Sequence, residues 1–192
     1  MNTKDYLGRI WHGGDYNPEQ WPESVWDEDV ALMQQAGWNI ATLPVFGWTA
    51  LQSDDETFHF KWLDRVLDKL HAGGIGACLA TATGSVPAWI SERYPDVLTV
   101  NSRGQQMRHG GRHIFCPHSP SFHRLSTNLV RRLAERYAQH PALKIWHVSN
   151  EYGGNAVGGR CYCHRCAQAF RLWLQERYGS LAHLNQRWDT AF

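Results

Sequence analysis

The sequence predicts an α/β fold made of about four βα units, the N-terminal half of a (β/α)₈ (TIM) barrel. Short apolar strand candidates alternate with amphipathic helix candidates, which indicates a parallel sheet. Polar and aromatic segments directly follow the strand candidates, where barrel enzymes carry their chemistry. No glycine-rich nucleotide-binding motif follows the first strand, and this disfavours a doubly wound fold. The 192 residues are expected to form one partial catalytic barrel domain, residues 1–192.

The first half of the chain supplies two βα units. Residues 9–15 form an apolar strand candidate that ends in the polar segment HGGDYNPEQW. Residues 22–37 follow as a helix, with apolar side chains three and four positions apart and a glycine at the end. Residues 38–45 are the second strand candidate, and residues 58–70 carry the same helical spacing.

The second half supplies two further units, separated by a long irregular stretch. Residues 75–81 (IGACLAT) are the third strand candidate. After a region rich in Pro and Gly, residues 120–139 repeat an apolar side chain every four positions and predict a long helix. Residues 143–149 (LKIWHVS) are the fourth strand candidate, and residues 163–178 the fourth helix.

Composition excludes several function classes. Nineteen Lys and Arg against eighteen Asp and Glu leave a formal charge of +1, so neither nucleic acid nor an anionic membrane is the expected partner. Residues 70–91 lack charged side chains, but their glycines and proline predict a strand, a loop and a short helix instead of a membrane span. The N-terminus lacks the pattern of a secretory peptide, so we expect a cytoplasmic protein.

Asn150 and Glu151 form the strongest candidate for chemistry, because they follow the fourth strand. A glutamate there would face the mouth of the barrel, and apolar neighbours at 146, 148 and 152 would help it hold a proton. Such an acid can protonate a glycosidic oxygen while the asparagine binds a sugar hydroxyl. The alternative is a glutamate that only caps or pairs in a surface loop. Its place at a strand end favours the catalytic interpretation.

A glycosidase normally needs a second carboxylate, as nucleophile or as base for water. Asp15 and Glu19 are the other acids that we place at strand ends. Neither lies in a motif that marks a nucleophile. The sequence therefore indicates one of the two carboxylates and leaves the other unassigned.

The segment Cys161-Tyr162-Cys163-His164-Arg165-Cys166 predicts a metal site. C-x-C-x-x-C places three thiols within reach of one ion, at a helix start that favours thiolates. Cys116 or His164 would complete a tetrahedral zinc site, and a site with four thiolates would be structural. Cys78 lies within the third strand and is expected to be a small buried side chain. In a reducing compartment this arrangement is favoured over disulfides.

Aromatic and polar side chains cluster at the expected strand ends and suit a carbohydrate, which offers apolar C–H faces and hydroxyls. Ten tryptophans are more than packing normally recruits. We assign Trp26, Trp62 and Trp173 to packing because they lie on amphipathic helices. Arg112 precedes Cys116 by four residues, so a metal-fixed loop would hold its guanidinium over the site. The alternative is an exposed arginine that binds no ligand. The strand-end set is Trp11, His12, Tyr16, Trp21, Trp48, Trp89, Arg112 and His113.

From about residue 8 to residue 192, the chain resembles glycoside hydrolase family 42, the β-galactosidases with a (β/α)₈ catalytic barrel. The segments that carry the resemblance include HGGDYNPEQW, TATGSVPAW, IFCPHSPSF, WHVSNEYGG and CYCHRCAQAF. The resemblance implies that Glu151 is the general acid/base of a retaining mechanism. It also implies that Asn150 and Arg112 bind the galactose unit.

The resemblance further implies a structural zinc ion held by Cys116, Cys161, Cys163 and Cys166. Full-length members of the family are expected to act on β-galactosides and to form trimers. The family's nucleophilic glutamate lies on the seventh strand, beyond the four strands expected here. We therefore expect a fragment that carries the acid/base but is inactive alone, with an unpaired strand edge and exposed apolar helix faces. The alternative functions are a zinc-stapled binding or interaction module without catalysis, an inactive remnant, and a barrel enzyme with another reaction.

Overall fold

The computed structural model of the chain describes residues 9–152 and 159–191. Within these residues a four-stranded parallel sheet has the order β1-β2-β3-β4, which is also the order of the strands in the sequence. The strands are β1 (Gly13–Asp15), β2 (Ile40–Leu43), β3 (Gly76–Ala80) and β4 (Leu143–His147). All four lie inside the predicted ranges and are shorter than them, because pairing ends where the chain leaves the sheet.

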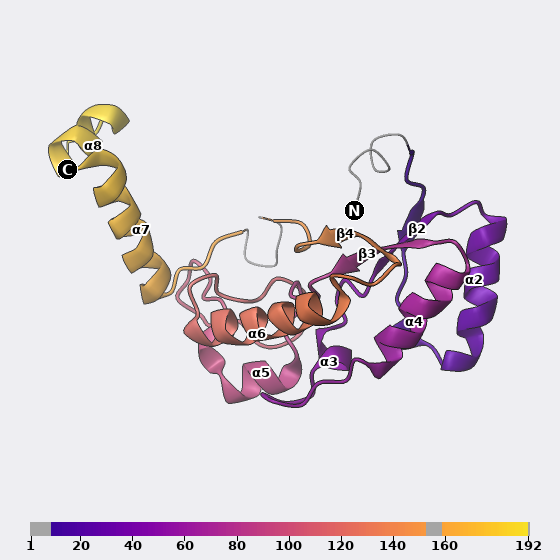
Figure 1. Cartoon of the computed structure of the whole chain (residues 1–192). Helices are drawn as coiled ribbons and strands as arrows, with labels where there is room; N and C mark the ends of the chain where they lie inside the picture. Colours follow the sequence, from indigo (N-terminus) through magenta and orange to yellow (C-terminus); the bar gives the residue numbers. More distant parts are fainter. Residues whose placement is uncertain (1–8, 153–158, 192) are drawn as a thin grey trace.

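The helices α2 (Trp26–Gln35), α4 (Lys61–Ala72) and α6 (Pro120–Tyr137) connect the strands. Right-handed crossovers between strands in sequential order place all connecting helices on one face of the sheet. Figure 1 shows these three helices on the same side of the strands. The fold is therefore that of half an α/β barrel, as the sequence predicted.

The core lies between the sheet and these helices. Ala41, Leu43, Ala77 and Leu79 alternate along β2 and β3 toward the helices and are completely buried. On the opposite face Thr42 pairs with Cys78 in register, and both are only half-buried. One face of the sheet is thus well covered by the described residues and the other is partly open.

The helix α5 (Ala88–Arg93) is the short helix expected after the strand and loop of residues 70–91, whereas α3 (Trp48–Leu51) and α8 (Leu181–Trp188) were not expected from the sequence. Each has eight residues or fewer, too short for a helical repeat to stand out. The predicted helix at 22–37 begins instead with the 3₁₀ turn Glu23–Val25 before α2. A second 3₁₀ turn, Pro18–Gln20, follows β1, and a third, Pro95–Val97, follows α5.

The long segment between β3 and α6 is held by a few specific contacts. Leu98 and Phe115 form an isolated β-bridge. The Ser119 hydroxyl caps α6 by accepting from the Phe122 amide at 3.0 Å and donates to the Asp96 carboxylate at 2.6 Å. These contacts let a stretch with little regular structure keep one shape.

The helix α7 (His164–Tyr178) and α8 project away from the sheet (Figure 1). Trp173 was assigned to packing, but 46% of its surface is exposed and its ring stacks on Phe170. That assignment is wrong here because the described residues place no element against this side of α7. It holds for Trp26, which is buried, and for Trp62, which packs against the core.

The exposed apolar helix faces expected for half a barrel are present on α7 and α8. They consist of Phe170, Leu172, Trp173, Leu181 and Trp188. In the described part of the chain, β1 and β4 are the two edges of the sheet. No described helix is both long enough and apolar enough to cross a membrane.

Two leucines on different helices test where stability comes from. Leu67 on α4 is completely buried, whereas Leu172 on α7 is 58% exposed. We expect Leu67→Ala to lower the free energy of unfolding by about 2–5 kcal/mol because it leaves a cavity in the core. Leu172→Ala should change it by less than about 0.5 kcal/mol. Urea denaturation followed by circular dichroism measures both, and equal losses would contradict the described core.

Candidate functional site

The exits of β3 and β4 are tied together, and this places the candidate site. The Thr81 amide donates to the His147 carbonyl at 3.0 Å, and the Thr81 hydroxyl donates to the Val148 carbonyl at 2.8 Å. Thr83 lies 3.0 Å from the same hydroxyl. The chain then turns through Asn150 into Glu151. Sequence reasoning noted the TATG segment as a strand end but did not identify Thr81 as the residue that fixes the neighbouring exit.

Glu151 and Arg112 meet at this exit. The Arg112 guanidinium lies 3.1 Å from the Glu151 carboxylate, and both side chains are more than half exposed. The Arg112 guanidinium also lies 5.7 Å from the centre of the Phe46 ring. Glu151 has a φ of 44°, in the left-handed region that non-glycine residues rarely adopt. Such backbone positions occur often at functional sites.

Within residues 9–152 and 159–191, the apolar neighbours of Glu151 in the sequence do not enclose it. Val148 is 64% exposed and Tyr152 is 80% exposed, while Trp146 packs toward the helix face of the sheet. Sequence neighbours at a strand end alternate in direction, so apolar residues nearby in the chain need not surround the carboxylate.

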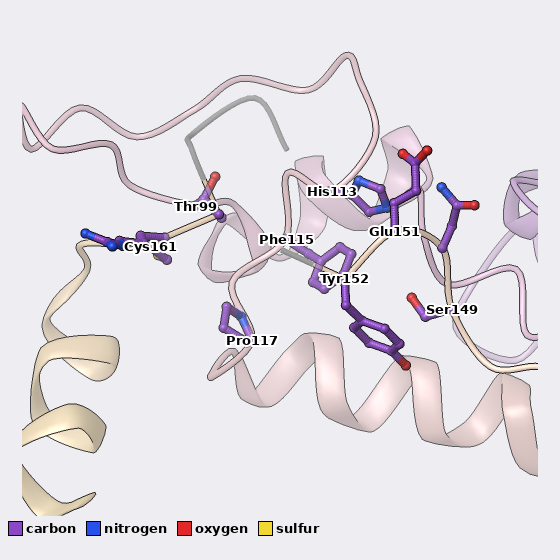
Figure 2. A pocket seen from close by; sticks show the side chains of 11 residues that line it. Thr99, His113, Phe115, Pro117, Ser149, Glu151, Tyr152 and Cys161 are labelled. Atoms are coloured by element: carbon purple, nitrogen blue, oxygen red, sulfur yellow. The ribbon is translucent and has the colours of Figure 1, made fainter. Parts of the chain in front are cut away.

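A pocket of about 220 Å³ lies beside Glu151. Figure 2 shows Glu151 and His113 at one end of it and Thr99 and Cys161 at the other, next to the start of α7. Its lining includes one carboxylate. The lining residues are Thr99, His113, Phe115, Pro117, Ser149, Asn150, Glu151, Tyr152, Gly159, Arg160 and Cys161.

The other strand-end acids do not line this pocket. Glu19 is half-buried, and burial raises the pKa of its carboxyl above the usual range. Its Oε2 atom is buried without a hydrogen-bond partner in the described chain. Asp15 pairs with Thr42 in the sheet register. The structure therefore brings neither of them to Glu151.

Several of the strand-end rings belong to the core instead of the pocket. Trp48 is completely buried and donates its indole N–H to the Gln52 side chain at 2.8 Å. Trp89 is half-buried and donates to the Gln52 carbonyl at 3.0 Å. Tyr16 is buried and donates its hydroxyl to Asp29 at 2.9 Å. Trp48 as a sugar platform is thus wrong, because the short helix α3 turns its ring inward.

The remaining members of that set divide by exposure. Trp21 is 62% exposed. His12 is also exposed, and its backbone amide donates a hydrogen bond to Asn39 Oδ1 at 2.9 Å. Trp11 is half-buried, with the Arg9 guanidinium 5.6 Å from its ring centre. His113 is buried and lines the pocket. Of the eight residues, Arg112 and His113 are the two that lie at Glu151 or its pocket.

Four cysteines form a cluster that could hold a metal ion. The sulfurs of Cys116, Cys161, Cys163 and Cys166 all lie within 4.8 Å of one another. Cys116 comes from the loop before α6, and the other three open α7. The group that could hold an ion thus includes Cys116 and does not include His164. Cys78 lies apart in β3, half-buried, and burial raises the pKa of its thiol.

The thiols of the cluster differ in their tendency to ionise. Burial raises the pKa of Cys116 and raises that of Cys166 to about 12. For Cys163 burial acts in the same direction, but hydrogen bonds from the Cys166 backbone and from neighbouring thiols lower the pKa to about 7. Cys163 also precedes α7 as its N-terminal capping residue. One sulfur of the cluster is thus prepared to be a thiolate ligand near neutral pH.

The cluster and the pocket share a wall. Cys161 supplies one sulfur and also lines the pocket. The Val100 amide donates to the Cys161 sulfur at 3.3 Å, and the Tyr162 amide donates to the Val100 carbonyl at 2.8 Å. An ion at the cysteines would therefore fix the loop that forms one end of the pocket.

These features define a class of protein. A parallel βα sheet with a carboxylate, an amide and a guanidinium at the end of β4 has the architecture of an α/β-barrel hydrolase. The sequence profile of glycoside hydrolase family 42, described as beta-galactosidase, matches residues 15–192. The chain therefore belongs to this glycoside hydrolase family.

Curated relatives and solved structures agree with this membership. The chain is 50% identical to beta-galactosidase BgaP of Planococcus sp. (strain L4) over 189 residues, covering 98% of this chain and 27% of that protein. It is 50% identical to beta-galactosidase LacZ of Heyndrickxia coagulans over 184 residues, covering 96% and 27%. The crystal structure of the beta-galactosidase from Bacillus circulans sp. alkalophilus superposes with a TM-score of 0.88 at 47% identity, covering 96% and 26%.

The chain thus spans about a quarter of the length of the relatives that it matches. Its described sheet accounts for four of the strands of an α/β barrel. The family and the fold are established by these likenesses.

Substitution of Arg112 tests whether its ion pair with Glu151 contributes to the stability of the fold. Ion pairs between exposed side chains contribute about 0–1 kcal/mol, so Arg112→Met should change the free energy of unfolding by less than about 1 kcal/mol. As a contrast, the half-buried Asp55 carboxylate accepts hydrogen bonds from Arg93, Tyr94 and Arg124. Asp55→Asn should cost about 1–3 kcal/mol. Urea denaturation measures the free energy of unfolding of both variants. A larger decrease for Arg112→Met than for Asp55→Asn would show that Arg112 stabilises the fold.

Proposed function

We propose that this chain carries the acid/base half of a retaining β-galactosidase site. The observation that supports this most directly is the meeting of Glu151 and Arg112 at the exit of β4, in a chain that belongs to glycoside hydrolase family 42. In this proposal the substrate is a terminal β-galactose unit joined to a second group. Residues 1–192 then form part of one catalytic barrel domain.

Glu151 acts in both steps of the proposed reaction. Its carboxyl protonates the glycosidic oxygen of the departing group while a nucleophilic carboxylate attacks the anomeric carbon. The Glu151 carboxylate then takes a proton from water while the water oxygen attacks the anomeric carbon, which breaks the bond to the nucleophilic carboxylate and releases the sugar with net retention of configuration. Its exposure on the rim of the pocket is compatible with a leaving group that departs toward solvent.

Arg112 and Asn150 are proposed to bind the galactose unit. A guanidinium offers five N–H donors in a fixed plane, and an amide offers both donors and an acceptor. Sugar hydroxyls accept and donate hydrogen bonds, so these groups can fix the ring relative to Glu151. The 3.1 Å contact between Arg112 and Glu151 supports this proposal, because it places the guanidinium beside the proposed acid/base.

The nucleophile is proposed to come from outside the described pocket. Retaining enzymes hold their two carboxyl groups about 5–5.5 Å apart. The pocket lining contains one carboxylate, Glu151. The family resemblance assigns the nucleophile to a glutamate on a seventh strand. We therefore propose that these 192 residues alone do not turn over β-galactosides at a useful rate, and that whole family members act as homotrimers.

The metal of the cysteine cluster is proposed to be a structural zinc ion. A tetrahedral zinc with Zn–S distances of about 2.3 Å holds its sulfurs about 3.8 Å apart. The Cys116 sulfur lies 3.6 Å from Cys163 and 3.4 Å from Cys166, so the residues fit with small adjustments. Four protein ligands leave no open position, and zinc would link α7 to the loop before α6.

A second candidate function is a zinc-stapled binding module without catalysis. One observation favours it: the pocket offers a single carboxylate among the described residues that line it. Sugar binding through Arg112 and Asn150 needs no second acid. The two candidates differ in whether Glu151 is needed for turnover once the remaining strands of a barrel are supplied.

A chimera tests the catalytic role. The 189 aligned residues of Planococcus sp. (strain L4) beta-galactosidase BgaP would be replaced by this chain. We expect the chimera to hydrolyse lactose and Glu151→Gln to lower kcat/KM by about 10²–10⁴-fold, because the leaving oxygen loses its acid. The matched control Glu176→Gln, exposed on α7, should leave kcat/KM unchanged.

The leaving group separates acid catalysis from general damage. The dinitrophenolate of a dinitrophenyl galactoside leaves without being protonated. Glu151→Gln should therefore lower kcat/KM for this substrate far less than it lowers kcat/KM for lactose. Equal losses on both substrates would contradict the acid/base role. The unfused 192-residue protein should not release nitrophenol from nitrophenyl β-galactoside. Release that Glu151→Gln abolishes would overturn the proposed inactivity.

Metal analysis tests the zinc proposal. Protein purified without chelator should contain about one zinc ion per chain, as expected for a closed four-thiolate site. Cys166→Ser should lose that zinc and lower Tm, whereas Cys78→Ser, outside the cluster, should keep both. Elemental analysis and differential scanning calorimetry give the two readouts. Absence of stoichiometric metal in the unaltered chain would count against zinc.

A further inference from the structure

His113 is held rigidly at the pocket. Its φ is 58°, in the left-handed region, and its backbone amide donates to the Gly84 carbonyl at 2.9 Å. Its side chain is 6% exposed, and its ring meets the Phe115 ring edge to face at 6.4 Å. A non-glycine residue keeps such a backbone only where the surroundings impose it. The position of this imidazole is therefore set by the fold.

Three buried polar atoms of residues that line the pocket lack partners in the described chain: Thr99 Oγ1 at the Cys161 end, and two atoms at the Glu151 end. The Nε2 atom of His113 and the Nδ2 atom of Asn150 have no hydrogen-bond partner within residues 9–152 and 159–191. Nearly all buried polar atoms in folded proteins are hydrogen-bonded, so each exception calls for an explanation. Both residues line the pocket beside Glu151. A ligand that enters the pocket is a partner for both atoms.

The side chains of His113 and Asn150 both lie next to Gly84. A Cβ atom on Gly84 would lie 3.5 Å from the Asn150 Cβ and 3.6 Å from the His113 Nε2. It would lie 3.3 Å from the Phe46 ring, over which Arg112 is held. The missing side chain of Gly84 thus keeps room where His113, Asn150 and Phe46 converge.

The chemistry of the two atoms selects a hydroxyl. The Asn150 amide nitrogen is a donor, and a neutral imidazole Nε2 accepts when the proton is on Nδ1. A hydroxyl accepts one hydrogen bond and donates another, so it can satisfy both atoms at once. We propose that His113 is a further sugar-binding residue, which contacts a hydroxyl of the galactose unit together with Asn150. This inference rests on the proposed function and adds a specificity determinant to that site.

The test titrates D-galactose into the complete 192-residue chain and follows the imidazole nitrogens of His113 and the side-chain amide of Asn150 by NMR. Both should shift on binding. His113→Phe keeps a ring but removes the nitrogens, and should weaken binding by about five- to tenfold, the usual effect of one hydrogen bond. Near-ultraviolet circular dichroism checks that each variant keeps its fold.

Two further substitutions separate a hydrogen bond from a packing role. His113→Gln places a polar group where Nε2 lies and should bind within about twofold of the unaltered chain. His113→Asn tolerates the left-handed backbone better, but its amide reaches only the Nδ1 position. It should bind as weakly as His113→Phe. Equal weakening by the Gln, Asn and Phe variants would show a packing role and overturn the inference.

The same titration distinguishes the two proposals. If galactose shifts the signals of Asn150 and Glu151 but not those of His113, the role of His113 is overturned and the proposed function stands. If galactose shifts none of the three, the galactose site itself is overturned, and the role of His113 with it. Shifts at all three together with rescue by His113→Gln would support both proposals.

Discussion

The parallel pairing of β3 with β4 is the constraint on which the candidate site depends. It brings Thr81 against His147 and sets the exits of two strands side by side. The segment after β3 then delivers Gly84, and the segment after β4 delivers Asn150 and Glu151. These positions are 66 or more residues apart in the chain, yet they meet because carboxyl ends of parallel strands share one edge. The sheet sets the positions of the residues in such a site, and the local sequence determines only which side chains stand there.

The loop between β3 and α6 needs a second anchor, because the sheet fixes only its start. It carries Arg112 to Glu151, His113 to the pocket and Cys116 to the cluster. The cysteine cluster ties the end of this loop to the beginning of α7, and Cys161 stands in both the cluster and the pocket wall. The geometry of the pocket and of the cysteine cluster is therefore coupled through a few residues. Metal ligands that orient a neighbouring loop act in this way in other proteins.

Sequence reasoning reached the fold, the order of its elements and the cysteine cluster, because periodicity and ligand spacing are local signals. It failed where the outcome depends on distant packing. Trp48 follows a strand, as a sugar-binding ring would, but the short helix α3 buries it. Val148 and Tyr152 are apolar neighbours of Glu151 in sequence, yet they point into solvent. Trp173 shows the opposite failure: its helical spacing predicts a buried face, and the described residues offer nothing to cover it.

The uncovered surfaces of the described chain have one physical explanation. Parallel sheets are normally covered on both faces. Here Ala41 and Leu79 are buried under helices, while Thr42 and Cys78 on the other face remain half-buried. In a closed barrel that second face is the interior, filled by side chains from the remaining strands. The relatives are nearly four times as long as this chain, which leaves ample length for such strands. In the proposed function the same strands also supply the second carboxylate, so closing the barrel and completing the proposed site would be a single structural event.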